Sequence, residues 1–136
     1  MYWYLRTLKK YAVFSGRAQR KEYWMFYLFN FFILLIIAAI FIIFYLLYYY
    51  DIFTGAGFIF IIISAFVFIL YNLVLIIPSI AITVRRLHDI GKSGMMLLVL
   101  LIPLVGWVWL LLLLTTKGDS DNNKYGKYPK IRTKFY

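Results

Sequence analysis

His88 and Asp89 are the residues whose types and spacing point first to chemistry, because a histidine beside a carboxylate can act as a general acid or base. His88 is the only histidine, and the chain contains no cysteine. A metal site or a nucleophilic relay would need further ligands or a third group. We therefore predict no enzyme, no cofactor and no metal site, and we expect His88 to form a hydrogen-bonded structural contact or a pH-sensitive one.

Several other charged side chains lie in two motifs that flank apolar segments. The first motif, residues 14–24, reads F-S-G-R-A-Q-R-K-E-Y-W and supplies Gly16, Arg17, Arg20, Lys21, Glu22 and Trp24. The second motif, residues 78–94, reads P-S-I-A-I-T-V-R-R-L-H-D-I-G-K-S-G and supplies Arg85, Arg86, His88, Asp89, Gly91, Lys92, Ser93 and Gly94. The order of residues in the second motif predicts a helix end with basic residues, a glycine after the helix, and a serine N-cap for the next helix.

Glu22 and Asp89 are the only acids within these two motifs. Glu22 has no cation three or four residues away, whereas Asp89 has Arg86 and Arg85 at those distances. Because both motifs end apolar runs, we expect them at the same membrane face. We predict that each acid pairs with an arginine of the opposite motif, and the alternative is a solvated charge cluster or a belt of lipid-headgroup contacts.

Long apolar runs must position these motifs. Hydrophobic residues make up 65% of the chain, and the uncharged runs cover about 24–50, 57–84 and 95–116. A helix of about 20 residues crosses a membrane, so the composition predicts an all-α membrane protein. Its domains would be a basic segment (1–22), an integral membrane domain (23–116) and a basic polar tail (117–136), which we expect to be mobile.

The residues before and between the first two runs add local structure. Tyr4, Leu5, Leu8, Tyr11 and Ala12 share one helical face, which predicts an N-terminal interfacial amphipathic helix that ends at Ser15-Gly16. The short segment 51–56 predicts an antiparallel hairpin of two long transmembrane helices. That segment carries no cation, so we expect it to face outward and the N-terminus to face the cytoplasm.

The third run is interrupted by Pro103-Leu104-Val105-Gly106. Its 22 residues cross a membrane once as a single helix, and its halves suit a re-entrant hairpin. We favour three crossings because the first helices weigh most in orientation. A single crossing would nevertheless place six cations of the tail outside, whereas a re-entrant segment would keep them inside.

Two asparagines lie inside the apolar runs. Asn30 is one or two turns into the first run, and Asn72 is near the middle of the second. An amide in lipid seeks a hydrogen-bond partner, so we expect interhelical hydrogen bonds, with a place on a transport path as the alternative. Pro78, near the end of the second run, is expected to bend that helix.

Both motifs, together with I-P-L-V-G at residues 102–106 and N-K-Y-G-K-Y-P at 123–129, resemble one family over nearly the whole chain. It is the bacterial domain of unknown function 805, the YhaH/YhaI-like inner-membrane proteins. Met95-Met96 departs from the aromatic residues typical there. The resemblance implies a bacterial inner-membrane location and no particular reaction.

The net charge of +10 limits the kinds of partner that the protein can be expected to bind. The cations abut membrane segments, so we expect contact with membrane lipids, mainly anionic headgroups, and no nucleic acid. We predict a non-enzymatic membrane protein that binds headgroups or an unidentified membrane protein through its basic cytoplasmic face. The alternative is a subunit of a small homo-oligomeric transporter or channel, although such paths usually need charges within the spans.

Overall fold

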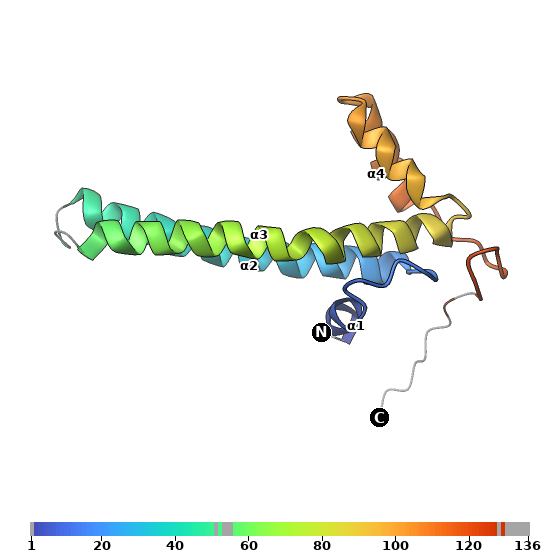
Figure 1. The fold of residues 1–136 in the computed structure, drawn as a ribbon, viewed down its shortest axis with the longest axis horizontal. Coiled ribbons are helices and arrows are strands. Elements are labelled where there is room, and N and C mark those ends of the chain that lie inside the picture. Colours follow the sequence, from blue (N-terminus) through green and yellow to red (C-terminus); the bar gives the residue numbers. More distant parts are fainter. Residues whose placement is uncertain (1, 51, 53–55, 128, 130–136) are drawn as a thin grey trace. The chain divides into compact units, whose positions relative to one another are not determined.

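The computed structural model describes residues 2–50, 52, 56–127 and 129, and the regular elements there are helices, as the sequence predicts. In chain order they are α1 (Tyr2–Lys9), α2 (Arg20–Tyr49), α3 (Ala56–Asp89), η1 (Gly94–Leu101) and α4 (Val105–Thr115), as Figure 1 shows. η1 is a 3-10 helix and the others are α-helices. Within the predicted outward turn, 51–56, residues 51 and 53–55 lie outside the described residues.

Helices α2 and α3 are both long and apolar enough to cross a membrane, with 30 and 34 residues. At about 1.5 Å per residue, either exceeds a hydrocarbon core of about 30 Å. Within the most apolar window of each helix, 0% and 6% of the residues are buried. A core helix of a soluble protein would be mostly covered, so these surfaces need an apolar solvent. Helix α3 continues through Pro78.

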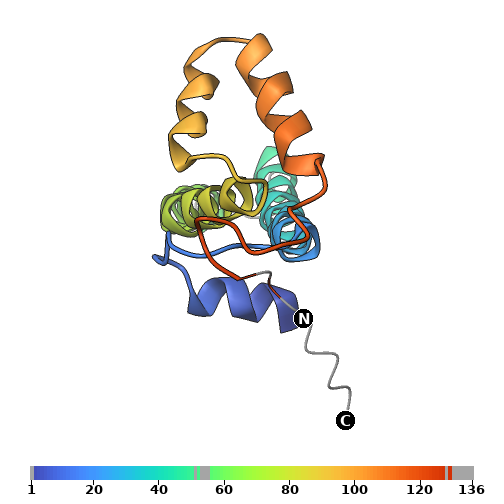
Figure 2. The same ribbon diagram turned by 90° about the vertical axis from the view of Figure 1, so that its right-hand side faces the viewer.

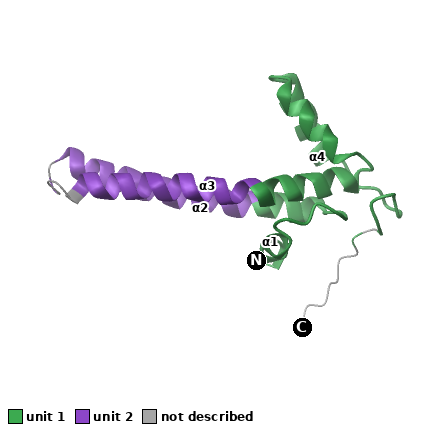
Figure 3. Cartoon of the chain, viewed as in Figure 1, with its two compact units in different colours: residues 1–26, 77–136 green, residues 27–76 purple. Residues whose placement is uncertain are grey.

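The chain forms two compact units, coloured separately in Figure 3. Unit 2, residues 27–76, is an antiparallel pair made by the parts of α2 and α3 that it contains. The rings of Phe44 and Phe60 stack with centroids 4.9 Å apart. Gly57 lies against Tyr48, where an added Cβ would come 3.0 Å from the tyrosine Cβ. Aromatic stacking and this close approach hold the two helices together in unit 2.

Unit 1, residues 1–26 and 77–136, contains α1, the start of α2, the end of α3, η1, α4 and the segment that follows. Its apolar core includes Ala18, Phe26, Ala81, Ile82 and Leu87, each at most 1% exposed. Figure 2 views α2 and α3 along their axes, with η1 and α4 forming a hairpin above the end of α3. Unit 1 therefore gathers both sequence motifs.

Helix α1 is shorter than the amphipathic pattern predicts, because it ends at Lys9 and not near Ala12. Tyr4 stacks on Phe26 with ring centroids 6.0 Å apart, whereas Leu5 and Tyr11 are exposed. The side chains of the predicted apolar face of α1 therefore have two different environments. One part packs on the protein and the other remains open to the surroundings.

The third apolar segment is a hairpin of two helices and not the one continuous helix that a single crossing of 22 residues would need. After η1, the N–H of Ile102 bonds the carbonyl of Val99, Leu104 adopts a positive φ of 61°, and α4 runs back beside η1. An added Cβ on Gly106 would come 1.8 Å from the Val99 carbonyl oxygen, so only glycine permits this approach. The physical reason is that Pro103 lacks an N–H and the glycine allows the two halves to pack closely.

Candidate functional site: a buried charge network and the cations around it

Glu22 pairs with Arg85 inside unit 1, which confirms that Glu22 finds a cation of the opposite motif. The Arg85 Nη1 donates to Glu22 Oε1 at 3.3 Å, and both residues are 1% exposed. Thr7 of α1 is fully buried, and its Oγ1 donates to the same carboxylate oxygen at 3.5 Å. One glutamate therefore joins α1, α2 and α3. The Arg85 Nη2 is buried without a hydrogen-bond partner among the described residues.

Asp89 pairs with two arginines, one from each motif. Its Oδ1 accepts from Arg17 Nε at 2.9 Å, and its Oδ2 accepts from Arg86 Nη1 at 2.6 Å. Asp89 is 3% exposed, Arg17 7% and Arg86 0%. The first contact confirms the predicted pairing between motifs, and the second is the predicted local pair. Charge-assisted bonds to both carboxylate oxygens fix the end of α3 against the N-terminal motif.

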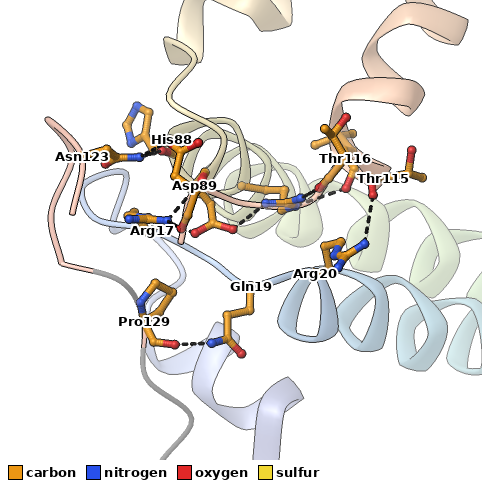
Figure 4. A network of polar contacts seen from close by, with 12 residues as sticks. Arg17, Gln19, Arg20, His88, Asp89, Thr115, Thr116, Asn123 and Pro129 are labelled. Carbon is orange, nitrogen blue, oxygen red and sulfur yellow. Dashed lines mark hydrogen bonds and ion pairs between the residues drawn. The ribbon is translucent and has the colours of Figure 1, made fainter. Parts of the chain in front are cut away.

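Arg86 and Arg20 also donate to backbone carbonyls at the end of α4 (Figure 4). Arg86 donates through Nε to the Leu114 carbonyl at 3.1 Å and through Nη2 to that of Thr116. Arg20 Nη1 donates to the Thr115 carbonyl at 3.4 Å. The last carbonyls of a helix lack intrahelical donors and carry partial negative charge, so cations at this position satisfy and stabilise them.

Residues 117–127 of the tail that we expected to be mobile make several hydrogen bonds to unit 1, and residues 128 and 130–136 of that tail lie outside the described residues. Arg17 donates to the carbonyls of Asp119 and Asp121 at 2.5 and 2.7 Å, and Gln19 donates to that of Pro129. The Asp119 N–H bonds the Asp89 carbonyl at 2.8 Å. The sequence did not indicate these contacts, because a polar, glycine-containing composition does not reveal that buried arginines elsewhere need acceptors.

His88 does not use Asp89 as its partner, because that carboxylate holds Arg17 and Arg86. The His88 Nδ1 lies 3.2 Å from the carbonyl oxygen of Gly16, so this nitrogen is the one that carries the proton. The imidazole stacks on the ring of Tyr125 at 3.8 Å with an interplanar angle of 5°. His88 thus links the first motif to the C-terminal segment, which supports a structural role.

The glycines and serine of the motifs shape the connection between α3 and η1. Gly91 has a φ of 71°, and the N–H groups of Gly91 and Lys92 bond the carbonyls of His88 and Leu87. This pattern is a Schellman C-cap. Ser93 then N-caps η1 by accepting from the Met95 N–H at 3.3 Å. The predicted caps are confirmed, although the capped element is a 3-10 helix.

Two further glycines serve close approach or an unusual backbone conformation. An added Cβ on Gly94 would come 2.9 Å from Val84 Cγ1, so side chains of the second motif pack on this glycine. Gly16 has a φ of 86°, which favours glycine and ends the segment after α1 as the sequence predicts. Both positions help to bring the N-terminal motif to the end of α3.

Among the motif residues singled out above, the exposed ones are Arg20, Lys21, Trp24, Lys92 and Ser93. Arg20 and Lys21 line two hollows in unit 1. The tryptophan hollow, about 750 Å³, is lined by Trp3, Arg20, Lys21, Trp24, Met25 and Thr115. The lysine hollow, about 410 Å³, is lined by Gln19, Arg20, Lys21, Asp89, Lys117, Gly118 and Ser120.

The two intramembrane asparagines differ. Asn30 is buried, and its Oδ1 accepts from the Tyr71 hydroxyl at 2.6 Å, which confirms the predicted interhelical bond in unit 2. Asn72 is exposed, and its Nδ2 donates to the carbonyl of Phe68 in its own helix at 2.8 Å. Asn72 therefore makes no interhelical bond within the described part of this chain, because its side chain is exposed and bonds its own helix.

Four residues of the network were not singled out from the sequence. Thr7 bonds Glu22, and an added Cβ on Gly118 would come 2.0 Å from Asp89 Oδ2. Asn123 Nδ2 donates to the His88 carbonyl at 2.9 Å, and Tyr125 stacks on the His88 ring. The N-K-Y-G-K-Y-P string contains the last two, so its resemblance to a family motif was the available signal. Thr7 and Gly118 carried no comparable signal.

Comparisons with known proteins cover almost the whole chain. Inner membrane protein YhaI of Escherichia coli (strain K12) is 41% identical over 131 residues, which cover 96% of this chain and 98% of that relative. Inner membrane protein YhaH of the same strain is 33% identical with the same coverage. No solved structure matches the chain significantly. A family model described as "Protein of unknown function (DUF805)" matches residues 11–127, and the chain is therefore a membrane protein that belongs to this family.

Proposed function

We propose that the protein is a non-enzymatic component of the bacterial inner membrane that binds anionic phospholipid at the two hollows beside Arg20 and Lys21. The observation that carries the proposal is a division among the cations of unit 1. Arg17, Arg85 and Arg86 are buried with acids, whereas Arg20, Lys21 and Lys117 are exposed around hollows. The buried arginines are committed to the fold, so the exposed group is the one available to a ligand.

The chemistry of the exposed group suits a phosphate. The side chains of Lys21 and Lys117 make no hydrogen bond or ion pair within the part of the chain that the structure describes. The Arg20 side chain donates only a long hydrogen bond to the Thr115 carbonyl there. Both Asp89 oxygens are occupied by arginines, which offsets the acid in the wall of the lysine hollow. Each cation near an anionic surface contributes on the order of 1 kcal/mol.

The adjoining tryptophan hollow suits the remainder of a phospholipid. Trp3 and Trp24 are of the type that concentrates at the membrane interface, where an apolar ring lies beside polar groups. Because Arg20 and Lys21 line both hollows, a phosphate between them would place the glycerol and the first acyl carbons against the tryptophans. This pairing favours a glycerophospholipid over a free phosphate ion.

Native mass spectrometry in mixed micelles of phosphatidylglycerol and phosphatidylcholine tests the proposal. The combined variant Arg20→Gln, Lys21→Gln and Lys117→Gln should lose at least tenfold in bound phosphatidylglycerol, on the basis of about 1 kcal/mol per cation. The matched control Lys9→Gln, Lys10→Gln and Lys92→Gln removes equal charge from exposed positions outside both hollows. Equal losses of bound phosphatidylglycerol in both variants would contradict a site at the hollows. If glycerol phosphate displaced the bound phosphatidylglycerol, the site would recognise the phosphate group and not the whole lipid.

A further inference from the structure

Asn72 is the one amide of the two apolar runs that unit 2 leaves on its outer surface, and its surroundings are entirely apolar. Leu73 and Val74 beside it are 57% and 64% exposed, and Ile69 and Ile76, one turn away on either side, are 57% and 50% exposed. The apolar run of α3 spans residues 57–84, so Asn72 lies near its middle. Hydrocarbon at that depth offers no hydrogen-bond donor.

The Asn72 amide is only partly satisfied. Its Nδ2 donates to the Phe68 carbonyl at 2.8 Å, and its Oδ1 makes no hydrogen bond among the described residues. Asn30 provides the internal comparison, because its Oδ1 accepts from Tyr71 at 2.6 Å and its side chain is buried. The Oδ1 of Asn30 thus accepts a hydrogen bond inside the hairpin, whereas the Oδ1 of Asn72, on the outside, accepts none among the described residues.

We propose that the Asn72 face of α3 is a homodimer interface in which the Asn72 amides of two copies hydrogen-bond each other. An amide carries both donors and acceptors, so it complements its own copy. All copies insert in the same orientation, so a twofold axis along the membrane normal brings the two Asn72 side chains to the same depth. A different protein would need a matching polar group at that depth.

The packing around Asn72 suits such an interface. Ala65 lies two turns before Asn72 on the same helical face, and Ile69 and Ile76 flank the amide. A small residue permits close helix approach, and the isoleucines supply the van der Waals contact that drives association in lipid. The proposal does not depend on lipid binding, because Asn72 belongs to unit 2 and the hollows belong to unit 1.

Oxidative cross-linking in membranes tests the interface, because the chain has no cysteine of its own. The single substitution Ile76→Cys, beside Asn72, should give a disulfide-linked dimer. The matched control Val74→Cys lies at a similar depth on another face and is also exposed, so it should remain monomeric. Equal cross-linking at both positions would indicate random collision and would overturn the proposal.

A second measurement isolates the amide. Replacing Asn72 with leucine should lower the association constant of the dimer in detergent about three- to twentyfold. This range corresponds to the free energies typical of interhelical polar contacts in membranes. Asn72→Gln should retain most of the association, because its amide reaches the same partner. Asn30→Leu serves as a fold control that perturbs the hairpin without touching this face. An unchanged constant for Asn72→Leu, with the protein folded, would overturn the proposal.

Discussion

Five charged side chains of unit 1 are buried inside the protein, those of Arg17, Glu22, Arg85, Arg86 and Asp89. Three cations against two acids leave an excess of positive charge. Backbone carbonyls compensate for it, because Arg17 and Arg86 together donate to those of Asp89, Leu114, Thr116, Asp119 and Asp121. The acids thus account for only part of the network, and the carbonyls tie it to the segments on either side.

The Glu22–Arg85 pair should behave as a coupled unit in mutagenesis. Glu22→Gln or Arg85→Gln leaves one buried charge without its partner, so each should lower the free energy of unfolding by about 3–5 kcal/mol. The double variant should lose less than the sum of the two, because it buries neither charge alone. Thermal unfolding in detergent measures this, with exposed Arg20→Gln as a control. Strictly additive losses would contradict the pair.

Gly118 should tolerate no side chain, because its Cα lies against the Asp89 carboxylate. In Gly118→Ala the added Cβ would come 2.0 Å from Asp89 Oδ2 and would displace the carboxylate from Arg86. We expect a loss of about 1–3 kcal/mol in the free energy of unfolding, the usual cost of overpacking. Ser120→Ala, at an exposed neighbouring position, should change it by less than about 0.5 kcal/mol. Comparable unfolding temperatures for the two variants would show that this approach is not required.

At the scale of elements, the ends of α3 and α4 depend on each other. Helix α4 ends in carbonyls that need donors, and the end of α3 supplies Arg86, which in turn needs acceptors. The Gly91 cap and the Ser93 N-cap turn the chain from α3 into η1. The hairpin of η1 and α4 therefore begins and ends beside the same few residues of α3.

Gly106 should be the residue on which that hairpin depends. A Cβ in Gly106→Ala would overlap the Val99 carbonyl oxygen at 1.8 Å, and a backbone oxygen cannot move aside without opening the hairpin. We expect the free energy of unfolding to fall by about 1–3 kcal/mol and proteolysis between residues 99 and 106 to become faster. Val105→Ala, whose side chain is 68% exposed, is the matched control. Equal protease sensitivity of both variants would argue against close packing of η1 on α4.

For the whole molecule, the hairpin removes a conflict in the charge distribution. A single third crossing would separate the six cations after residue 116 from the six in residues 1–22. In the structure, Arg17 of the N-terminal motif bonds the carbonyls of Asp119 and Asp121, so this motif contacts the segment after α4 within unit 1. We therefore expect both basic regions on one face of the membrane, as the positive-inside rule predicts.

Both termini are accordingly expected in the cytoplasm. A fluorescent protein fused after Tyr136 should fluoresce, a periplasmic phosphatase fused there should be inactive, and the same reporters at the N-terminus should agree. A cysteine in place of Thr54 should react with an impermeant thiol reagent applied outside, because the 51–56 segment carries no cation. An active phosphatase at the C-terminus would restore the three-crossing topology, and labelling of position 54 only after permeabilisation would reverse the orientation.

Composition and local spacing alone determined several features of this protein. The uncharged runs predicted long helices because 20 or more apolar residues suit a membrane, and Gly91 and Ser93 predicted caps because their backbone and hydrogen-bonding preferences are local. The pairing of Glu22 and Asp89 with arginines also followed, since a hairpin returns both motifs to one face.

Only the tertiary structure decided which arginine meets which acid, which cations remain exposed, and how the third segment folds. Arg17 and Arg20 look equivalent in the sequence, yet one is buried against Asp89 and the other lines both hollows. Asn30 and Asn72 differ likewise, because Asn30 of α2 bonds Tyr71 of α3, whereas Asn72 of α3 bonds only its own helix among the described residues. These outcomes depend on contacts between residues far apart in the chain, such as Arg17 and Asp121, which are 104 positions apart, and no local pattern encodes them.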